Sequence, residues 1–237
     1  MRKLFFILLF MFVCSSAFAV NYCDDPNARV CLNFLDNSSP TTDDSGNGFN
    51  GVLSGSIVWN AGLYYDFDGS NDYIYNDDGI GISTTDESTI VVRFKAVSTG
   101  TNKYISAFRD AYGDRGHLMF DGSAKMYFKR VGSDATGTTV IQTGTWYNVC
   151  IPYDITSGVP TIYLDGSDDT ASTTADTTPE DWTKYAVGAR WGALFFEGAV
   201  DYFAIFDREF SEAECQDINT NGLTGATSTF TPYVMIF

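Results

Sequence analysis

The stretch WYNVCIPYDITSGVPTIYLDG, residues 146–166, shows the pattern that decides the fold class of this chain. Two apolar, strand-like pieces, Trp146–Tyr153 and Thr161–Leu164, are separated by a Ser-Gly turn and followed by an Asp-Gly turn. β-Branched and aromatic residues favour extended backbone, whereas Gly beside Ser or Asp favours tight turns. The stretch therefore predicts two short strands joined by turns.

Similar pieces recur at regular intervals on both sides of this stretch. The predicted strands cover residues 30–35, 56–59, 63–67, 72–75, 89–94, 103–108, 117–120, 125–131, 138–141, 146–153, 161–164, 184–189 and 199–206. Asp-Gly, Ser-Gly and Asn-Gly turn signals lie between them. Spacing of this kind without helical periodicity predicts an all-β protein with two antiparallel sheets packed as a sandwich.

One helix is expected, after Ser211. The sequence Ser211-Glu-Ala-Glu214 is a capping box, and the helix should end near Gly222. Residues 165–183 are the most polar stretch and are predicted to form a surface loop, while the apolar residues 230–237 are predicted to form a final strand. We see no linker or repeat, so residues 20–237 are predicted to form a single domain.

Residues 1–19 have the features of a signal peptide. Arg2 and Lys3 precede ten apolar residues, and Ala17-Phe-Ala19 is a small-x-small cleavage pattern. The alternative is an uncleaved anchor, but a bilayer span needs about 20 apolar residues. We expect cleavage after Ala19, no membrane segment in the mature chain, and a protein that is secreted, extracellular or on the cell surface, with the periplasm also possible.

Four cysteines remain after cleavage: Cys23, Cys31, Cys150 and Cys215. An even number in an exported chain predicts up to two disulfides, and four cysteines allow three pairings. We expect Cys23–Cys31, which closes a small N-terminal loop, together with Cys150–Cys215. The alternative for Cys150 is a buried free thiol, because it lies in an apolar strand.

The charge balance is strongly acidic. The chain has 14 Lys and Arg against 30 acidic residues, 24 Asp and six Glu, for a net charge of -16. Without the two basic residues of the leader the balance is 12 against 30, or -18. Such a surface repels phosphate backbones and anionic lipids, so we expect neither nucleic-acid binding nor a polybasic membrane contact.

Three segments, in order, resemble the laminin-G-like, concanavalin A-like jelly-roll family. They are YDFDGSNDYI at 65–74, the stretch at 146–166, and an ending within residues 185–214 that contains YAVGAR, FEGAVD and FDREFSEAE. With the loop at 44–51, the resemblance covers roughly residues 30–220. It implies two curved antiparallel sheets stacked face to face. It also implies an extracellular recognition module, often for glycans and often with calcium.

Calcium is the cofactor that the resemblance implies. Domains of this kind often hold an ion between the first and last strands, which makes Asp36 and Asp201 the first pair of candidate ligands. Asp68 and Asp72 in the turn of residues 67–72 are a second possibility. The alternative for Asp68 is an Asx turn, in which the carboxylate bonds only to nearby backbone.

Glycan binding would use flat aromatic rings in loops, which stack on the apolar faces of sugars. The candidates are Tyr112, Trp182 and Trp191, each with plain packing as the alternative. We assign Trp59 and Trp146 to the core.

The sequence predicts that the protein is not an enzyme. His117 is the only histidine, no Gly-x-Ser-x-Gly motif is present, and no Glu-x-Asp-x-x-Glu strand motif occurs. Glu197 and Asp201 are the nearest carboxylate pair, and we interpret both as structural. We therefore expect a module that binds a glycan or glycoprotein.

A structural or adhesive surface protein with possible self-association is the alternative, and the apolar C-terminus favours it. A glycan-active enzyme is the third possibility.

Overall fold

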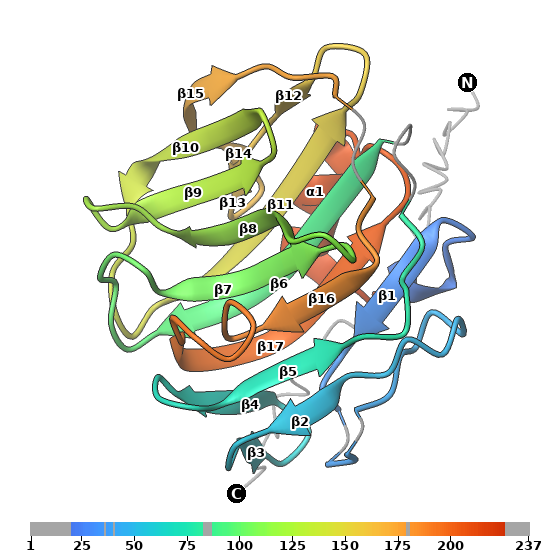
Figure 1. The fold of residues 1–237 in the computed structure, drawn as a ribbon, viewed down its shortest axis with the longest axis vertical. Coiled ribbons are helices and arrows are strands. Elements are labelled where there is room, and N and C mark those ends of the chain that lie inside the picture. The colour runs from blue at the N-terminus through green and yellow to red at the C-terminus, as the bar shows by residue number, and fades with distance from the viewer. Residues whose placement is uncertain (1–19, 36, 40, 83–86, 179–180, 226–237) are drawn as a thin grey trace, which may run out of the picture.

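A computed structural model describes residues 20–225 except 36, 40, 83–86 and 179–180. Two antiparallel sheets lie face to face with the hydrophobic core between them, and Figure 1 shows one sheet in front of the other. The predicted β-sandwich is confirmed. The expected leader at 1–19 and the expected strand at 230–237 lie outside the described residues.

The sheet at the back of Figure 1 has nine strands. Its order is β14 (Ser167–Asp168), β13 (Tyr163–Leu164), β11 (Trp146–Asp154), β6 (Ser88–Ala96), β17 (Glu197–Phe206), β4 (Tyr64–Asp68) and β3 (Val58–Asn60). In addition, β1 (Ala28–Leu32) pairs with β17, and β12 (Val159–Pro160) pairs with β11. The longest strands, β6, β11 and β17, lie side by side and form its centre.

The sheet at the front has eight strands. Its order is β15 (Thr170–Thr174), β10 (Ser133–Val140), β9 (Lys125–Arg130), β8 (Asp114–Phe120), β7 (Tyr104–Arg109), β16 (Lys184–Val187), β5 (Tyr73–Asn76) and β2 (Val52–Ser54). Strands β14 and β15 lie within residues 165–183, so the prediction of a loop there was wrong for part of the segment.

Alternation along each strand decides which side chains enter the core. In β6, Ile90, Val92 and Phe94 point inward and are buried, and the residues between them face outward. Leu118 and Phe120 of β8 meet them from the other sheet. Burying each such side chain contributes about 1.5–3 kcal/mol, so the space between the sheets holds most of the stabilising contacts.

A second, smaller cluster covers part of the outer face of the nine-stranded sheet. Helix α1 (Glu212–Asn221) lies there, behind the sheet in Figure 1, and starts at the predicted capping box. The Ser211 hydroxyl accepts from the Glu214 N–H, and the Glu214 carboxylate accepts from the Ser211 N–H at 2.8 Å. The helix ends at Gly222, which has a φ of 72°.

Both expected disulfides are present, Cys23–Cys31 and Cys150–Cys215. The second ties α1 to β11, so the alternative of a free thiol at Cys150 was wrong. The first joins the short helix η1 (Tyr22–Asp24) to β1.

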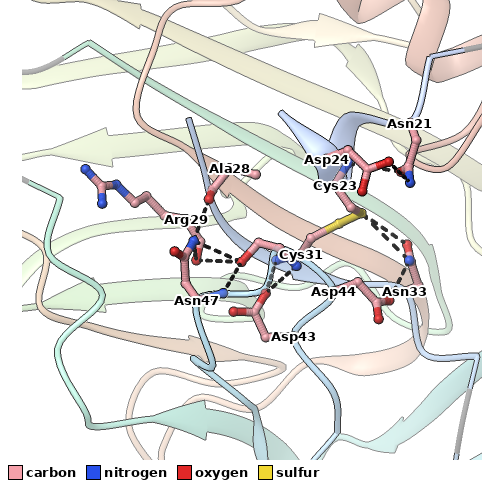
Figure 2. Close-up of a disulfide and its surroundings, with 11 residues drawn as sticks. Asn21, Cys23, Asp24, Ala28, Arg29, Cys31, Asn33, Asp43, Asp44 and Asn47 are labelled. Atoms are coloured by element: carbon pink, nitrogen blue, oxygen red, sulfur yellow. Dashed lines mark hydrogen bonds between the residues drawn. A yellow bond between two sulfur atoms is a disulfide. The ribbon is translucent and has the colours of Figure 1, made fainter. Parts of the chain in front are cut away.

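Next to the first disulfide, Asp43 organises the polar loop that follows β1 (Figure 2). Its carboxylate accepts from the N–H groups of Cys31 at 2.9 Å and Phe49 at 3.0 Å. The Asn47 side chain donates to the Ala28 carbonyl at 2.7 Å. These bonds satisfy backbone groups at and near the disulfide, which gives Asp and Asn in this loop a structural role.

Candidate functional site

The outward face of the eight-stranded sheet presents a row of rings, which we call the aromatic stripe. Its members are Tyr73 and Tyr75 of β5, Tyr104 of β7, which is only 5% exposed, His117 of β8, Tyr127 of β9 and Phe195 of the β16–β17 loop. On each strand the neighbours of these residues enter the core, so alternation turns the rings outward.

The rings of the stripe form two groups in contact, one around His117 and one around Tyr73. The His117 ring centre lies 4.9 Å from that of Tyr104 and 6.2 Å from that of Tyr127. Tyr73 and Tyr75 are 5.4 Å apart. The stripe crosses from β9 through β8, β7 and β16 to β5, and four strand spacings correspond to about 19 Å.

The β16–β17 loop, residues 188–196, lies against this face. Its tip is a tight turn in which the Arg190 N–H donates to the Ala193 carbonyl at 2.9 Å. Trp191 and Gly192 at the tip have φ values of 51° and 76°, as a type I′ turn requires. The same loop brings Phe195 to 6.2 Å from the Tyr73 ring. Positive φ at a tryptophan is strained, so the loop has a specified shape.

Cations gather on the same face. Six of the chain's 14 Lys and Arg residues lie there: Arg109, Arg115, Lys125, Lys129, Lys184 and Arg190. Several form ion pairs, including Lys184 with Asp77 at 3.1 Å. The Arg109 guanidinium lies over the Trp191 ring at 3.9 Å. The face therefore combines flat apolar rings with charged groups that can bond to hydroxyls.

His117 is neutral near pH 7 in this setting. Burial, followed by the charges of Arg190 and Lys129, lowers the pKa of its imidazole to about 4, and Asp114 only partly opposes this shift. Its ring nitrogens have no hydrogen-bond partner among the described residues.

A sequence model of the concanavalin A-like lectin/glucanases superfamily matches residues 68–216. The chain belongs to this superfamily. The resemblance drawn from the three sequence segments is thereby confirmed, and so is the fold that it implies. No curated protein sequence matches the chain significantly.

Several solved structures share the fold at low sequence identity. Domain 4 of an extracellular GH43 arabinanase from Geobacillus stearothermophilus, in complex with arabinotriose, has a TM-score of 0.64 and 18% identity over 81% of this chain and 98% of that one. The binding domain of Paraclostridial Mosquitocidal Protein 1 has a TM-score of 0.63 and 15% identity over 84% of this chain and 52% of that one.

A third structure is the Trypanosoma rangeli sialidase in complex with sialic acid. It has a TM-score of 0.61 and 13% identity over 81% of this chain and 32% of that one. The chain thus spans about half of the mosquitocidal binding domain and a third of the sialidase.

Of the ring residues predicted from the sequence, two lie in loops that join strands of the sandwich. Tyr112 is 90% exposed at the tip of the β7–β8 turn, where the Asp110 carboxylate accepts from its N–H at 2.7 Å. Trp191 is half-buried at the tip of the β16–β17 loop. The members of the stripe itself were missed, because the prediction considered rings in loops and all of these rings except Phe195 stand on strands.

The third predicted ring residue, Trp182, was assigned wrongly. It is 0% exposed and stacks on Phe108 with ring centres 4.4 Å apart, so no ligand can reach it. The assignment of Trp146 to the core was also wrong. It is half-buried on the outer face of the nine-stranded sheet, with Arg93 and Lys95 over its ring at 4.8 and 5.0 Å. Trp59 packs against the core as expected.

The predicted calcium ligands that the structure describes, Asp68, Asp72 and Asp201, already bond to protein groups. Asp36 lies outside the described residues. Asp201 forms an ion pair with Arg93, and burial raises the pKa of its carboxyl. Asp68 accepts from the N–H groups of Ser70 and Asn71, and these bonds lower the pKa of its carboxyl.

Asp72 has a similar structural role, because its carboxylate accepts from the N–H groups of Ser56 and Asp68. The Asx-turn alternative for Asp68 is therefore what the structure shows.

A different group of carboxylates brings three oxygens close together on the surface. Glu87, Asp154 and Glu209 each offer an oxygen, and these oxygens lie within 4.8 Å of one another. They come from neighbouring strand ends: before β6, at the end of β11 and after β17. Burial and the two other carboxylates raise the pKa of Glu209. Calcium takes oxygen ligands of this type. The three residues are far apart in the sequence, so no local motif marks the group.

Proposed function

We propose that this chain is an exported, non-enzymatic recognition module that binds a carbohydrate or glycoconjugate on the outward face of its eight-stranded sheet. The observation that supports it most strongly is the aromatic stripe, which crosses five neighbouring strands beside a cluster of charged side chains. Flat rings stack on the apolar faces of sugars, while charged and amide groups bond to the hydroxyls.

The length of the stripe favours an oligosaccharide over a single sugar. Rings at both ends, Tyr75 on β5 and Tyr127 on β9, are half-buried, so part of each ring is accessible. A rival aromatic pair, Tyr64 and Trp146, lies on the outer face of the nine-stranded sheet. We favour the stripe because it has more rings, and because two cations, Arg93 and Lys95, lie over the Trp146 ring, whereas only Arg190 lies over a ring of the stripe, Tyr104.

The comparisons support the ligand class. The arabinanase domain that shares this fold was solved with arabinotriose, and other neighbours are binding domains of toxins. Two disulfides support export, since such bonds persist in oxidising compartments. The described part of the chain holds no helix with the length and hydrophobicity of a membrane span. The non-enzymatic part of the proposal rests on the single histidine and the missing glycosidase motif.

A glycan array tests the proposal. The wild-type chain is expected to bind a defined set of oligosaccharides on the array. The double variant Tyr75→Ala/Tyr127→Ala is expected to lose this binding. Removing two stacking rings should weaken binding by about tenfold or more. A wild-type chain that binds no glycan, or a double variant with the wild-type profile, would overturn the proposal.

Calcium is the cofactor part of the proposal, and it rests on the family resemblance. If the ion binds with millimolar affinity, 10 mM Ca²⁺ should raise Tm by roughly 3–5 °C, because a ligand of the folded state stabilises it by mass action. Thermal unfolding with and without Ca²⁺ measures the shift. If Glu209→Gln reduces the Ca²⁺-induced shift in Tm, the Glu87, Asp154 and Glu209 group holds the ion. An unchanged shift would mean that another site holds it. No shift at 10 mM would contradict the calcium proposal.

A further inference from the structure

A pocket of about 350 Å³ opens beside the middle of the aromatic stripe. It is lined by Asp114, Arg115, Gly116, His117, Lys129, Val131, Gly132 and Arg190. Three parts of the chain build it: β8, the end of β9 with the turn that follows, and the β16–β17 loop. His117 therefore belongs both to the stripe and to the pocket.

The sheet register and the loop hold these side chains in place. His117 and Lys129 are directly opposite each other on β8 and β9, with both side chains on the outward face. Arg190 is anchored by Asp114, whose carboxylate accepts from its Nε at 2.7 Å. The pocket is thus assembled by neighbouring strands and one pinned arginine.

The pocket is positive in a protein with a net charge of -16. Arg115 is neutralised by Asp110 at 2.7 Å and Arg190 by Asp114, which leaves Lys129 as the excess charge. Within the described chain, the Lys129 ammonium has no ion-pair or hydrogen-bond partner. Lys129 is exposed, so its unpaired charge is accessible to an anionic ligand that enters the pocket.

We propose that this pocket binds the anionic group of an acidic sugar, a carboxylate or a sulfate ester, while the neighbouring rings of the stripe hold the sugar itself. The inference rests on the proposed carbohydrate-binding function and names the class of ligand. Lys129 supplies the unpaired charge, and Arg190 supplies further N–H donors at the opposite wall. The His117 ring, with Tyr104 and Tyr127 on either side, joins the pocket to the stripe.

The environment of His117 adds a dependence on pH. The charged groups that face it are Arg190 from the loop, Lys129 from β9 and Asp114 at the start of β8. The two cations and burial together hold the pKa of the imidazole at about 4. A bound anion opposes the cations and raises this pKa, so binding takes up a proton. Affinity for the anionic ligand should then increase as the pH falls from 7 toward 5.

The test compares three oligosaccharides of equal length by titration calorimetry: one carboxylated, one sulfated and one neutral. The wild-type chain is expected to bind an acidic form about tenfold or more tightly than the neutral form, since charge-assisted hydrogen bonds give effects of this size. The arm with the higher affinity identifies carboxylate or sulfate as the anionic group. Lys129→Gln should bring the ratio close to one.

Two controls separate the pocket from general electrostatics. Lys95→Gln removes an equal charge from the outer face of the other sheet and should leave the ratio unchanged. His117→Gln should abolish the increase in affinity between pH 7 and pH 5.

This inference would be overturned by equal affinity for the acidic and neutral forms, or by an equal loss of the affinity ratio in Lys129→Gln and Lys95→Gln. Either result would leave the carbohydrate-binding proposal intact. A chain that binds none of the three forms, and no other glycan, would overturn the proposed function itself.

Discussion

Trp182→Ala is expected to lower the free energy of unfolding by about 4 kcal/mol, which is typical for truncating a buried aromatic side chain. The ring has no exposed surface and stacks on Phe108, and Arg130 lies over it at 5.3 Å. Alanine would leave a cavity between the sheets that well-packed neighbours cannot fill. Urea unfolding followed by circular dichroism measures the change.

Trp191→Ala is the matched control for that experiment. Its ring lies at a loop tip on Arg109, outside the core. We expect a loss of no more than about 1 kcal/mol, as for an exposed cation–π contact. The account of the core would be wrong if Trp182→Ala cost less than Trp191→Ala.

The Cys150–Cys215 bond is expected to have the second large effect. It closes a loop of 65 residues between β11 and α1, so its removal frees more of the unfolded chain than removal of Cys23–Cys31, which are eight residues apart. Loop-closure entropy gives about 4 kcal/mol for the long loop and about 2.5 kcal/mol for the short one.

The double variants Cys150→Ala/Cys215→Ala and Cys23→Ala/Cys31→Ala test this order in the same urea assay. Each pair is buried in the cluster under α1, so both comparisons remove apolar contacts of the same kind. A larger loss of unfolding free energy in the Cys23→Ala/Cys31→Ala variant would contradict the assignment of the long-range bond as the main constraint on the unfolded chain.

Local signals made much of the fold predictable. Turn dipeptides between apolar pieces marked most strands of the sandwich, and the Ser211 capping box marked the start of α1 within one residue. Both depend on interactions between residues close in sequence. The strands within residues 165–183 were missed because they are polar and exposed, so no apolar pattern marks them.

The two tryptophan errors have one physical cause. Trp146 begins β11 beside an apolar run but faces outward, whereas Trp182 lies in a polar stretch but pairs with Ile82 and enters the core. Which face a residue occupies depends on the register of its strand with its neighbours, and a shift of one residue reverses it. Composition around a residue does not contain that information.

The aromatic stripe could not be predicted from the sequence for a related reason. Tyr75 and Tyr127 are 52 positions apart in sequence, and β16, from much later in the chain, lies between β5 and β7. Strand order of this kind follows from contacts across the whole sandwich. The Glu87, Asp154 and Glu209 group arises in the same way, at the ends of strands that are adjacent only in the folded protein.

The most direct test of the central proposal is a calorimetric titration of the best array ligand against two variants. Tyr75→Ala/Tyr127→Ala removes rings from the stripe, and Tyr64→Ala removes a comparable half-buried ring from the opposite face of the sandwich. The account predicts at least a tenfold rise in Kd for the stripe variant and less than a twofold change for Tyr64→Ala. The reverse pattern would place the ligand on the nine-stranded sheet and contradict the account.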